Sequence, residues 1–270
     1  NGALHGFYIS LFVRAGAMYE SERDNGITHF LEHAAVRNVN SRRGGGLYRT
    51  LDVYGLEFNA STYNEMGQFY ISGAGKSFGV AASVISEILA PITLTAKEID
   101  TERARIRAEI RESDERTSLA SFSNKIVFAD TSLSRPITGT PTTVAAITAK
   151  RLEEYRRRVF TPGNIFFYVT GAFSEDDIST LAEEIERYSL EPAEPNKNIA
   201  PVPQSFFDRD GTVQLKNADF TMARFTFDID MARVGMQVSD LLYDILLSGY
   251  SSDFFIELSE NRGLFYDLNG

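Results

Sequence analysis

The sequence predicts a layered α/β fold, because segments with the pattern of strands alternate along the chain with segments of helical periodicity. The composition agrees, since 43% of the 270 residues are hydrophobic and 24% are charged, which is ordinary for a globular protein. A stretch from 190 to 204 holds four of the eight prolines and predicts a stiff, extended linker. We therefore expect a large first part, a linker and a shorter second part.

Strands are expected at three places before the linker and at one place after it. Aromatic and β-branched residues gather in 7–13, 69–73 and 165–170. The last of these is a nearly continuous apolar run, which is typical of a strand buried on both faces. Beyond the linker, apolar residues alternate over 223–229, as they do in a strand with one buried face.

Helices are expected wherever apolar residues recur every three to four positions. This periodicity covers 26–36, 47–54, 78–89, 96–115, 149–159 and 175–188, and it returns over 238–246. Two of these helices have clear starts. Thr95 with Glu98 forms a capping box, and Ser174 precedes three acidic residues that suit the positive end of a helix dipole.

The net charge and the amino-acid composition exclude several classes of protein. The formal net charge is −10, which argues against nucleic-acid binding, because that requires a basic face. No run of 18 apolar residues occurs, so no membrane-spanning helix is expected. The first residues lack the features of a secretory signal, and a cytoplasmic location is expected. Because the chain has no cysteine, nitrogen and oxygen atoms must hold any metal.

Two of the three histidines stand four positions apart in the segment ITHFLEHAAV. On a helix, His29, Glu32 and His33 fall within an arc of about 100°, opposite an apolar stripe. Two imidazoles one turn apart can both reach one Zn²⁺ ion. Glu32 lies beside them, where it can act as general base toward a water activated by the metal.

A catalytic zinc normally takes a third protein ligand. With no cysteine and only His5 left, an acidic residue should supply it. The expected helix over 96–115 offers Glu102 and Glu109, two turns apart along the edge of its apolar stripe. Glu102 could also be no more than a buried partner of Arg103 or Arg105.

The segment HFLEH matches H-x-x-E-H, the inverted zinc motif. With it the chain resembles the inverzincin metallopeptidases, the family of pitrilysin, insulin-degrading enzyme and mitochondrial processing peptidase, as a short-chain bacterial-type member. Glu109 stands 76 positions after His33, where that family has its third ligand, and Glu102 matches a second family glutamate thought to support catalysis. Further segments that agree in order are GLEFNASTYNE, LSRPITGT, YRRRVFTPGNIFFYVTGAF and ILLSGYSSDFFIELSENRGLFYDLN.

The resemblance implies a mixed sheet with helices on one face, duplicated in two related halves that form a clamshell, the second half being incomplete here. It predicts a zinc-binding catalytic domain over 1–190 and the proline-rich linker over 191–204. Residues 205–270 would then begin a second, homologous domain that binds no metal.

The same resemblance implies a zinc-dependent endopeptidase, with Zn²⁺ as cofactor and a peptide or unfolded polypeptide as substrate. Its metal ligands would be His29, His33 and Glu109, and its catalytic residues Glu32 and Glu102. The substrate would extend along an edge strand near Asn59 and Ala60, and Tyr266 would reach it from the second part. The alternative is a non-catalytic peptide-binding or assembly subunit. Either could form a homo- or heterodimer with a related chain.

Overall fold

The computed structural model describes residues 4–112, 119–129, 131–197, 211–212, 221–227 and 229–265. The chain forms two compact units, Asn1–Met222 and Ala223–Gly270. No helix within the described ranges has both the length and the hydropathy needed to cross a membrane.

A four-stranded sheet forms the centre of the first unit. Its strands are β1 (Gly6–Val13), β2 (Glu57–Thr62), β3 (Gly67–Ala74) and β4 (Ile165–Gly171), in the order β2-β3-β1-β4. All three pairings between these strands are antiparallel, which differs from the mixed sheet that was expected. The difference arises because the β2–β3 hairpin inserts β3 between β1 and β2, the two strands that run in the same direction.

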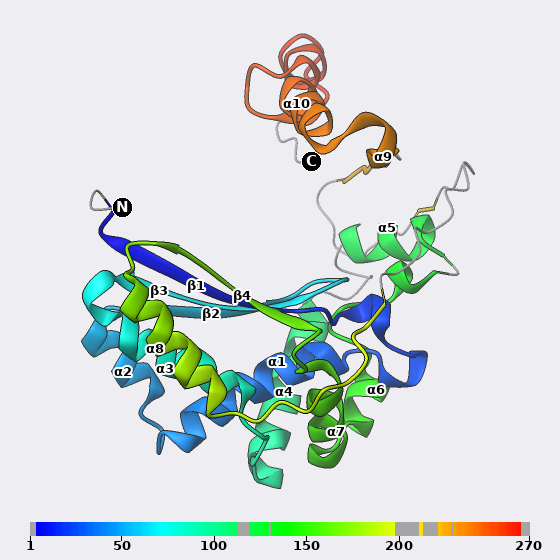
Figure 1. Cartoon of the computed structure of the whole chain (residues 1–270). Coiled ribbons are helices and arrows are strands. Elements are labelled where there is room, and N and C mark those ends of the chain that lie inside the picture. Colours follow the sequence, from blue (N-terminus) through cyan, green and yellow to red (C-terminus); the bar gives the residue numbers. More distant parts are fainter. Residues whose placement is uncertain are drawn as a thin grey trace. The chain divides into compact units, whose positions relative to one another are not determined.

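Helices cover one face of this sheet. In chain order, the helices described in the first unit are α1 (Ile27–Arg42), α2 (Leu47–Tyr54), α3 (Phe78–Ser86), α4 (Ala96–Glu112), α5 (Leu119–Val127), α6 (Pro141–Ala146), α7 (Ala149–Val159) and α8 (Glu175–Glu186). Figure 1 shows α1, α2, α3, α4, α7 and α8 together on one side of the sheet. The expected layered α/β class, with helices on one face, is confirmed.

Expected and observed bounds agree closely for most helices, but α1 continues to Arg42, past its expected end at residue 36. Helices α5 and α6 were not expected. Helices α2 and α7 have the expected bounds, and α3 passes into a short 3-10 turn at Glu87–Leu89. The expected capping box forms at Thr95 with Glu98, and the expected helix start at Ser174 also has a capping box, with Asp177. Residues 113–115 of the expected long helix lie outside the described residues.

The core lies between the sheet and its helices. Ile9 and Leu11 of β1 and Ile71 of β3 point to this side and are fully buried. Phe30 of α1 and Ile85 of α3 meet them from the helical layer. Burial of each such side chain contributes about 1.5–3 kcal/mol, so this interface fixes α1 against the sheet.

The opposite face of the sheet is open at β4, and the expectation that this strand is buried on both faces is wrong. Phe166 is 60% exposed and Tyr168 is 52% exposed. Phe166 instead stacks on Phe12 of β1, with ring centroids 4.9 Å apart. The apolar run could not reveal this, because β4 is an edge strand and the helices cover only one side.

In the second unit, the described residues form α9 (Met231–Val234), α10 (Met236–Leu247) and a π-helical turn at Phe255–Glu260. Helix α10 confirms the helix expected over 238–246. The strand expected over 223–229 is wrong, since the described residues of that segment are not in a strand. A lone strand has no hydrogen-bond partner to hold it, and this unit offers none among its described residues.

The start of α1 depends on a side chain outside the helix. Gly26 takes the N-cap position with a left-handed backbone (φ 91°) and gives no side-chain cap. Glu20 replaces that cap, because its carboxylate accepts from the backbone N–H of Gly26 at 2.7 Å and of Thr28 at 2.9 Å. A carboxylate also suits the positive end of the helix dipole. Glu20 therefore holds the first turn of α1, one residue before His29.

We predict that Gly26→Ala lowers the free energy of unfolding by about 2 kcal/mol or more. An alanine Cβ would stand 2.7 Å from Gly139 Cα and 2.8 Å from Thr138 O, in addition to the strain of the left-handed backbone. Chemical denaturation measures the loss. Gly44→Ala is the control, since Gly44 is also left-handed but has open space around it, and it should lose only about 1 kcal/mol. Equal losses would contradict the steric explanation.

Candidate metal centre

Three side chains from two helices converge at one point of the first unit. His29 and His33 lie one turn apart on α1, and Glu109 faces them from α4. Glu109 Oε2 lies 2.9 Å from His29 Nε2, and Glu109 Oε1 lies 3.5 Å from His33 Nε2. One donor atom of each residue lies within 4.8 Å of the others. The structure thus brings together the three ligands expected from the sequence.

The packing of α1 on α4 explains this convergence. Ile99 and Ile106 of α4 are buried in the core, which fixes the rotation of the helix. Glu102 and Glu109 follow from the same stripe and therefore face α1. Their exposure differs, because the Glu102 side chain is 2% exposed whereas that of Glu109 is 40% exposed. Of these two glutamates, only Glu109 is both near the histidines and open to solvent.

The donor set fits a zinc ion. Two imidazole nitrogens and one carboxylate oxygen are a known catalytic zinc set, which leaves a further position open. Electrostatics favour a cation here as well. Burial lowers the pKa of His29, but Glu32 and Glu109 outweigh it and raise that pKa above its ordinary value. A site that draws a proton onto an imidazole through two carboxylates is one where a divalent cation competes with that proton.

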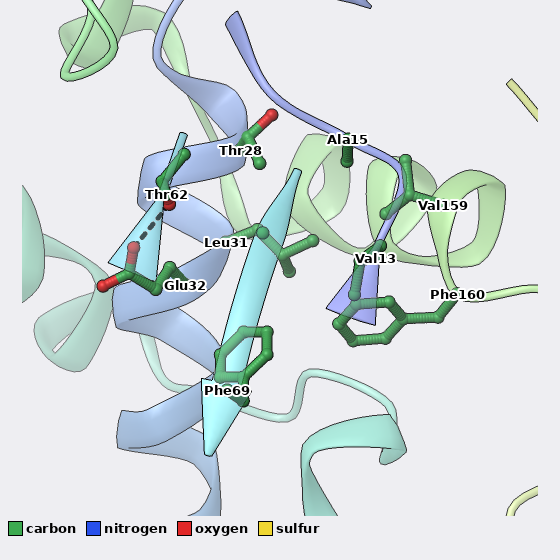
Figure 2. Close-up of a pocket in the computed structure, with 10 residues that line it drawn as sticks. Val13, Ala15, Thr28, Leu31, Glu32, Thr62, Phe69, Val159 and Phe160 are labelled. Atoms are coloured by element: carbon green, nitrogen blue, oxygen red, sulfur yellow. Dashed lines mark hydrogen bonds between the residues drawn. The ribbon is translucent and has the colours of Figure 1, made fainter. Parts of the chain in front are cut away.

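Glu32 lies on the far side of His29 from Glu109. Its Oε2 atom is 3.6 Å from His29 Nδ1, and the hydroxyl of Thr62 on β2 donates a hydrogen bond to the same oxygen (Figure 2). Burial raises the pKa of Glu32, but the nearby His29 ring and the Thr62 hydroxyl stabilise the charged form more and hold the pKa below its ordinary value. Glu32 is therefore ionised at neutral pH and able to accept a proton.

Glu102 contacts the other side of His33. Its Oε2 atom lies 3.4 Å from His33 Nδ1, so the ring presents Nε2 to Glu109. Arg105 donates to both oxygens of Glu102, at 3.1 and 3.2 Å. Burial raises the pKa of Glu102, but His33, Arg105 and Arg37 together hold it below its ordinary value. A carboxylate on the second nitrogen of a histidine ligand fixes the orientation of the ring.

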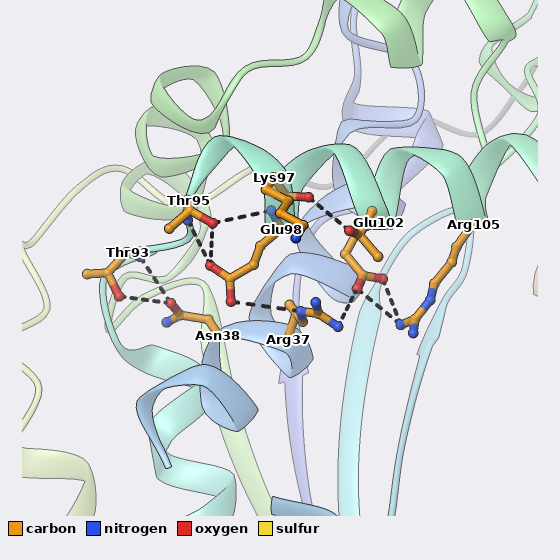
Figure 3. A network of polar contacts seen from close by, with 9 residues as sticks. Arg37, Asn38, Thr93, Thr95, Lys97, Glu98, Glu102 and Arg105 are labelled. Carbon is orange, nitrogen blue, oxygen red and sulfur yellow. Dashed lines mark hydrogen bonds and ion pairs between the residues drawn. The ribbon is translucent and has the colours of Figure 1, made fainter. Parts of the chain in front are cut away.

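Arg37 joins this network from α1 (Figure 3). Its guanidinium lies 3.6 Å from Glu102 and 3.9 Å from Glu98, both on α4. Arg37, Thr62 and Glu20 were not predicted from the sequence as parts of the centre. The sequence could have predicted the place of Arg37, because this residue stands four positions after His33 and therefore lies on the same face of the helix. Among the described residues, Arg103 makes no contact with Glu102 and pairs with Asp100 instead.

The residues expected to bind substrate are placed only in part. Strand β2 lies at the edge of the sheet, with Asn59 exposed and Ala60 half-buried against the core. Its Thr62 end adjoins Glu32. Tyr266 lies outside the described residues.

Family models match most of the chain. The insulinase model, peptidase family M16, matches residues 5–141, which contain the whole centre. The model of the peptidase M16 inactive domain matches residues 146–270. The chain belongs to peptidase family M16. The sequence-based resemblance is thereby confirmed.

Relatives of this M16 chain are known in several organisms. A zinc protease of Mycobacterium bovis is 24% identical over 280 residues, covering 98% of this chain and 62% of the relative. The β subunit of human mitochondrial-processing peptidase is 28% identical over 177 residues, covering 65% of this chain and 36% of that protein. A crystal structure of a protease from Helicobacter pylori shares the fold with a TM-score of 0.77 at 17% identity, covering 96% of this chain and 64% of that one. The M16 chain thus spans less than two thirds of the length of each of these proteins.

We expect the protein to bind one zinc ion and Glu109→Gln to weaken that binding by more than about 100-fold, beyond the 10- to 100-fold typical of outer contacts. The reason is that a neutral amide oxygen replaces a charged ligand. Competition with a chromophoric chelator measures the dissociation constant. Glu183→Gln, on the exposed face of α8, is the matched control and should bind like the wild type. Unchanged affinity in Glu109→Gln would exclude this residue as a ligand.

Proposed function

We propose that this chain carries the catalytic centre of a zinc-dependent endopeptidase that cleaves extended peptides. The observation behind the proposal is the convergence of His29, His33 and Glu109 beside an ionised Glu32. Membership of a peptidase family supports it, as do relatives that are named zinc proteases. The proposed catalytic domain spans 1–190, followed by a linker over 191–204 and a second domain from 205.

The roles of the residues follow from their positions. A zinc ion held by His29, His33 and Glu109 would polarise the peptide carbonyl and bring the pKa of a water molecule toward 7. Glu32 then takes a proton from the attacking water and delivers it to the leaving amine nitrogen. Its lowered pKa in the folded protein keeps the carboxylate deprotonated before the first of these transfers.

Glu102 acts in this proposal through His33 and not on the substrate. Its side chain is 2% exposed, so a peptide cannot reach it. Its contact with His33 Nδ1 holds the ring in the orientation that aims Nε2 at the metal position. The role expected from the sequence is therefore narrowed from a catalytic residue to a positioning residue.

The substrate is proposed to add to the sheet at β2. An edge strand has unpaired backbone groups, and an extended peptide can pair with them as a further strand. In this position Asn59 and Ala60 would contact the peptide backbone, close to Glu32. We propose that Tyr266 contributes from the second part of the chain.

Glu32→Gln should reduce peptide cleavage at least about 100-fold, since general-base catalysis typically contributes 10²–10⁴-fold. Zinc affinity should remain, because Glu32 is not a proposed ligand. Cleavage of a mixed peptide library by the full-length protein, with and without a chelator, measures the first point, with Glu183→Gln as control. Competition with a chromophoric chelator measures the second. A protein that binds zinc but cleaves no peptide would favour the alternative, a peptide-binding or assembly subunit. Cleavage that persists in Glu32→Gln would rule out the proposed base.

Glu102→Gln should weaken zinc binding by about 10- to 100-fold, the usual cost of losing an outer carboxylate. The glutamine amide fills the same space as the Glu102 carboxylate, so a loss of zinc affinity measures the effect of the negative charge beside His33. Glu98→Gln is the matched control, because Glu98 shares the Arg37 network and, among the described residues, makes no hydrogen bond or ion pair with a histidine. Equal affinity in both variants would show that Glu102 is only a structural partner of the arginines.

A further inference from the structure

We infer that Thr62 is a positioning residue for Glu32, and that it ties the proposed base to the strand on which the substrate is proposed to bind. The inference rests on the proposed function and adds to it a residue that neither the motif nor the metal ligands include. It concerns one hydrogen bond, from the Thr62 hydroxyl on β2 to the Glu32 carboxylate on α1.

The first step is the direction of the Thr62 side chain. Side chains alternate along a strand, so Thr62 shares a face of β2 with Ala60, which packs against the core. Thr62 therefore points toward the helical layer and not toward the open face of the sheet. Figure 2 shows its hydroxyl turned to the Glu32 carboxylate, which comes from the neighbouring turn of α1.

The second step is that no other described residue donates a hydrogen bond to the Glu32 carboxylate. Thr62 provides the one hydrogen bond to Glu32 among the described residues. His29 Nδ1 lies 3.6 Å from the same oxygen, an electrostatic contact that is too long for a hydrogen bond. Glu32 Oε1 accepts no hydrogen bond from a described residue. One oxygen is thus held by β2, and the other is left for proton transfer.

The third step is the surroundings of the pair. A pocket next to Glu32 and Thr62 is lined mainly by apolar side chains, among them Leu31 and Phe69. Its other hydroxyl, that of Thr28, lies 2.6 Å from the hydroxyl of Tyr155 and is engaged there. An apolar wall offers water few partners, so a water molecule is a poor substitute for Thr62. Without this hydroxyl the Glu32 carboxylate could take other rotamers.

The consequence is the alignment of Glu32 with the peptide bond that is cleaved. A peptide that adds to β2 takes its register from the backbone of β2, and Thr62 fixes Glu32 to the same strand. Base and scissile bond would then be positioned from one rigid element. An error of about 1 Å in such a placement can cost about 100-fold in rate, so one hydroxyl at this position has a large effect on turnover.

The test compares three variants of the full-length protein. Thr62→Val removes the hydroxyl and keeps the shape, and Thr62→Ser keeps the hydroxyl. Thr180→Val is the control, because the Thr180 hydroxyl bonds only the Asp176 carbonyl within α8. The measurements are kcat and KM on a cleaved peptide, the zinc dissociation constant, and crystal structures of the wild type and Thr62→Val.

Thr62→Val should lower kcat by about 10- to 100-fold with little change in KM, and Thr62→Ser should restore most of the loss. All variants should bind zinc like the wild type, and the crystal structure of Thr62→Val should show the Glu32 carboxylate displaced. Thr180→Val should match the wild type in every measurement.

Three results would overturn the inference. These are wild-type kcat in Thr62→Val, no rescue by Thr62→Ser, and a Glu32 carboxylate in its original position in the Thr62→Val structure. Failure of the proposed function has a different signature, namely a wild type without chelator-sensitive cleavage. In that case the two crystal structures still decide whether Thr62 holds the carboxylate.

Discussion

The centre depends on the packing of α1 against α4, which brings carboxylates of one helix against imidazoles of the other. Buried carboxylates are costly unless charged or hydrogen-bonding partners surround them. Glu102 meets this condition through Arg37, Arg105 and His33. The apolar residues of α4 fix the rotation of the helix, and the charged groups then fix its position along α1. Because Glu109 lies two turns beyond Glu102, the same packing sets its distance from both histidines.

The charged network around Glu102 is better explained by the positions that it gives to the site residues than by a gain in folding stability. Replacing a buried ion pair with apolar residues is often neutral or stabilising, so the Arg37–Glu102 contact is weak evidence for a gain in folding free energy. Its geometry does have a specific effect, since it leaves His33 Nε2 free of the arginines and aimed at Glu109. Polar groups buried at such expense are expected where a site needs them. The first turn of α1 follows the same logic, with Glu20 in place of a side-chain cap.

Local patterns predicted most of the helices and the residues that converge at the candidate metal centre, but not the contacts between distant segments. His29 and His33 could be found because their spacing matches one helical turn. The apolar stripe offered both Glu102 and Glu109, and the family resemblance singled out Glu109 by its distance in sequence from His33. Thr62 and Glu20 could not be found, because their roles depend on a strand and a loop that meet α1 only in the folded chain. The error at β4 has a related cause. An apolar run shows that residues avoid water on average, but not which face of a sheet the helices cover.

Strand order explains why the centre belongs to one edge of the sheet. Both β2 and β4 are edge strands, yet they differ in what they present. β4 exposes aromatic rings, of which Phe166 is braced by stacking on Phe12, whereas β2 exposes the polar Asn59 and lies beside Glu32. An unpaired polar edge accepts a further strand through its backbone groups, and its side chains give that strand little apolar surface to bind. Backbone recognition at β2 therefore suits the proposed cleavage of extended peptides.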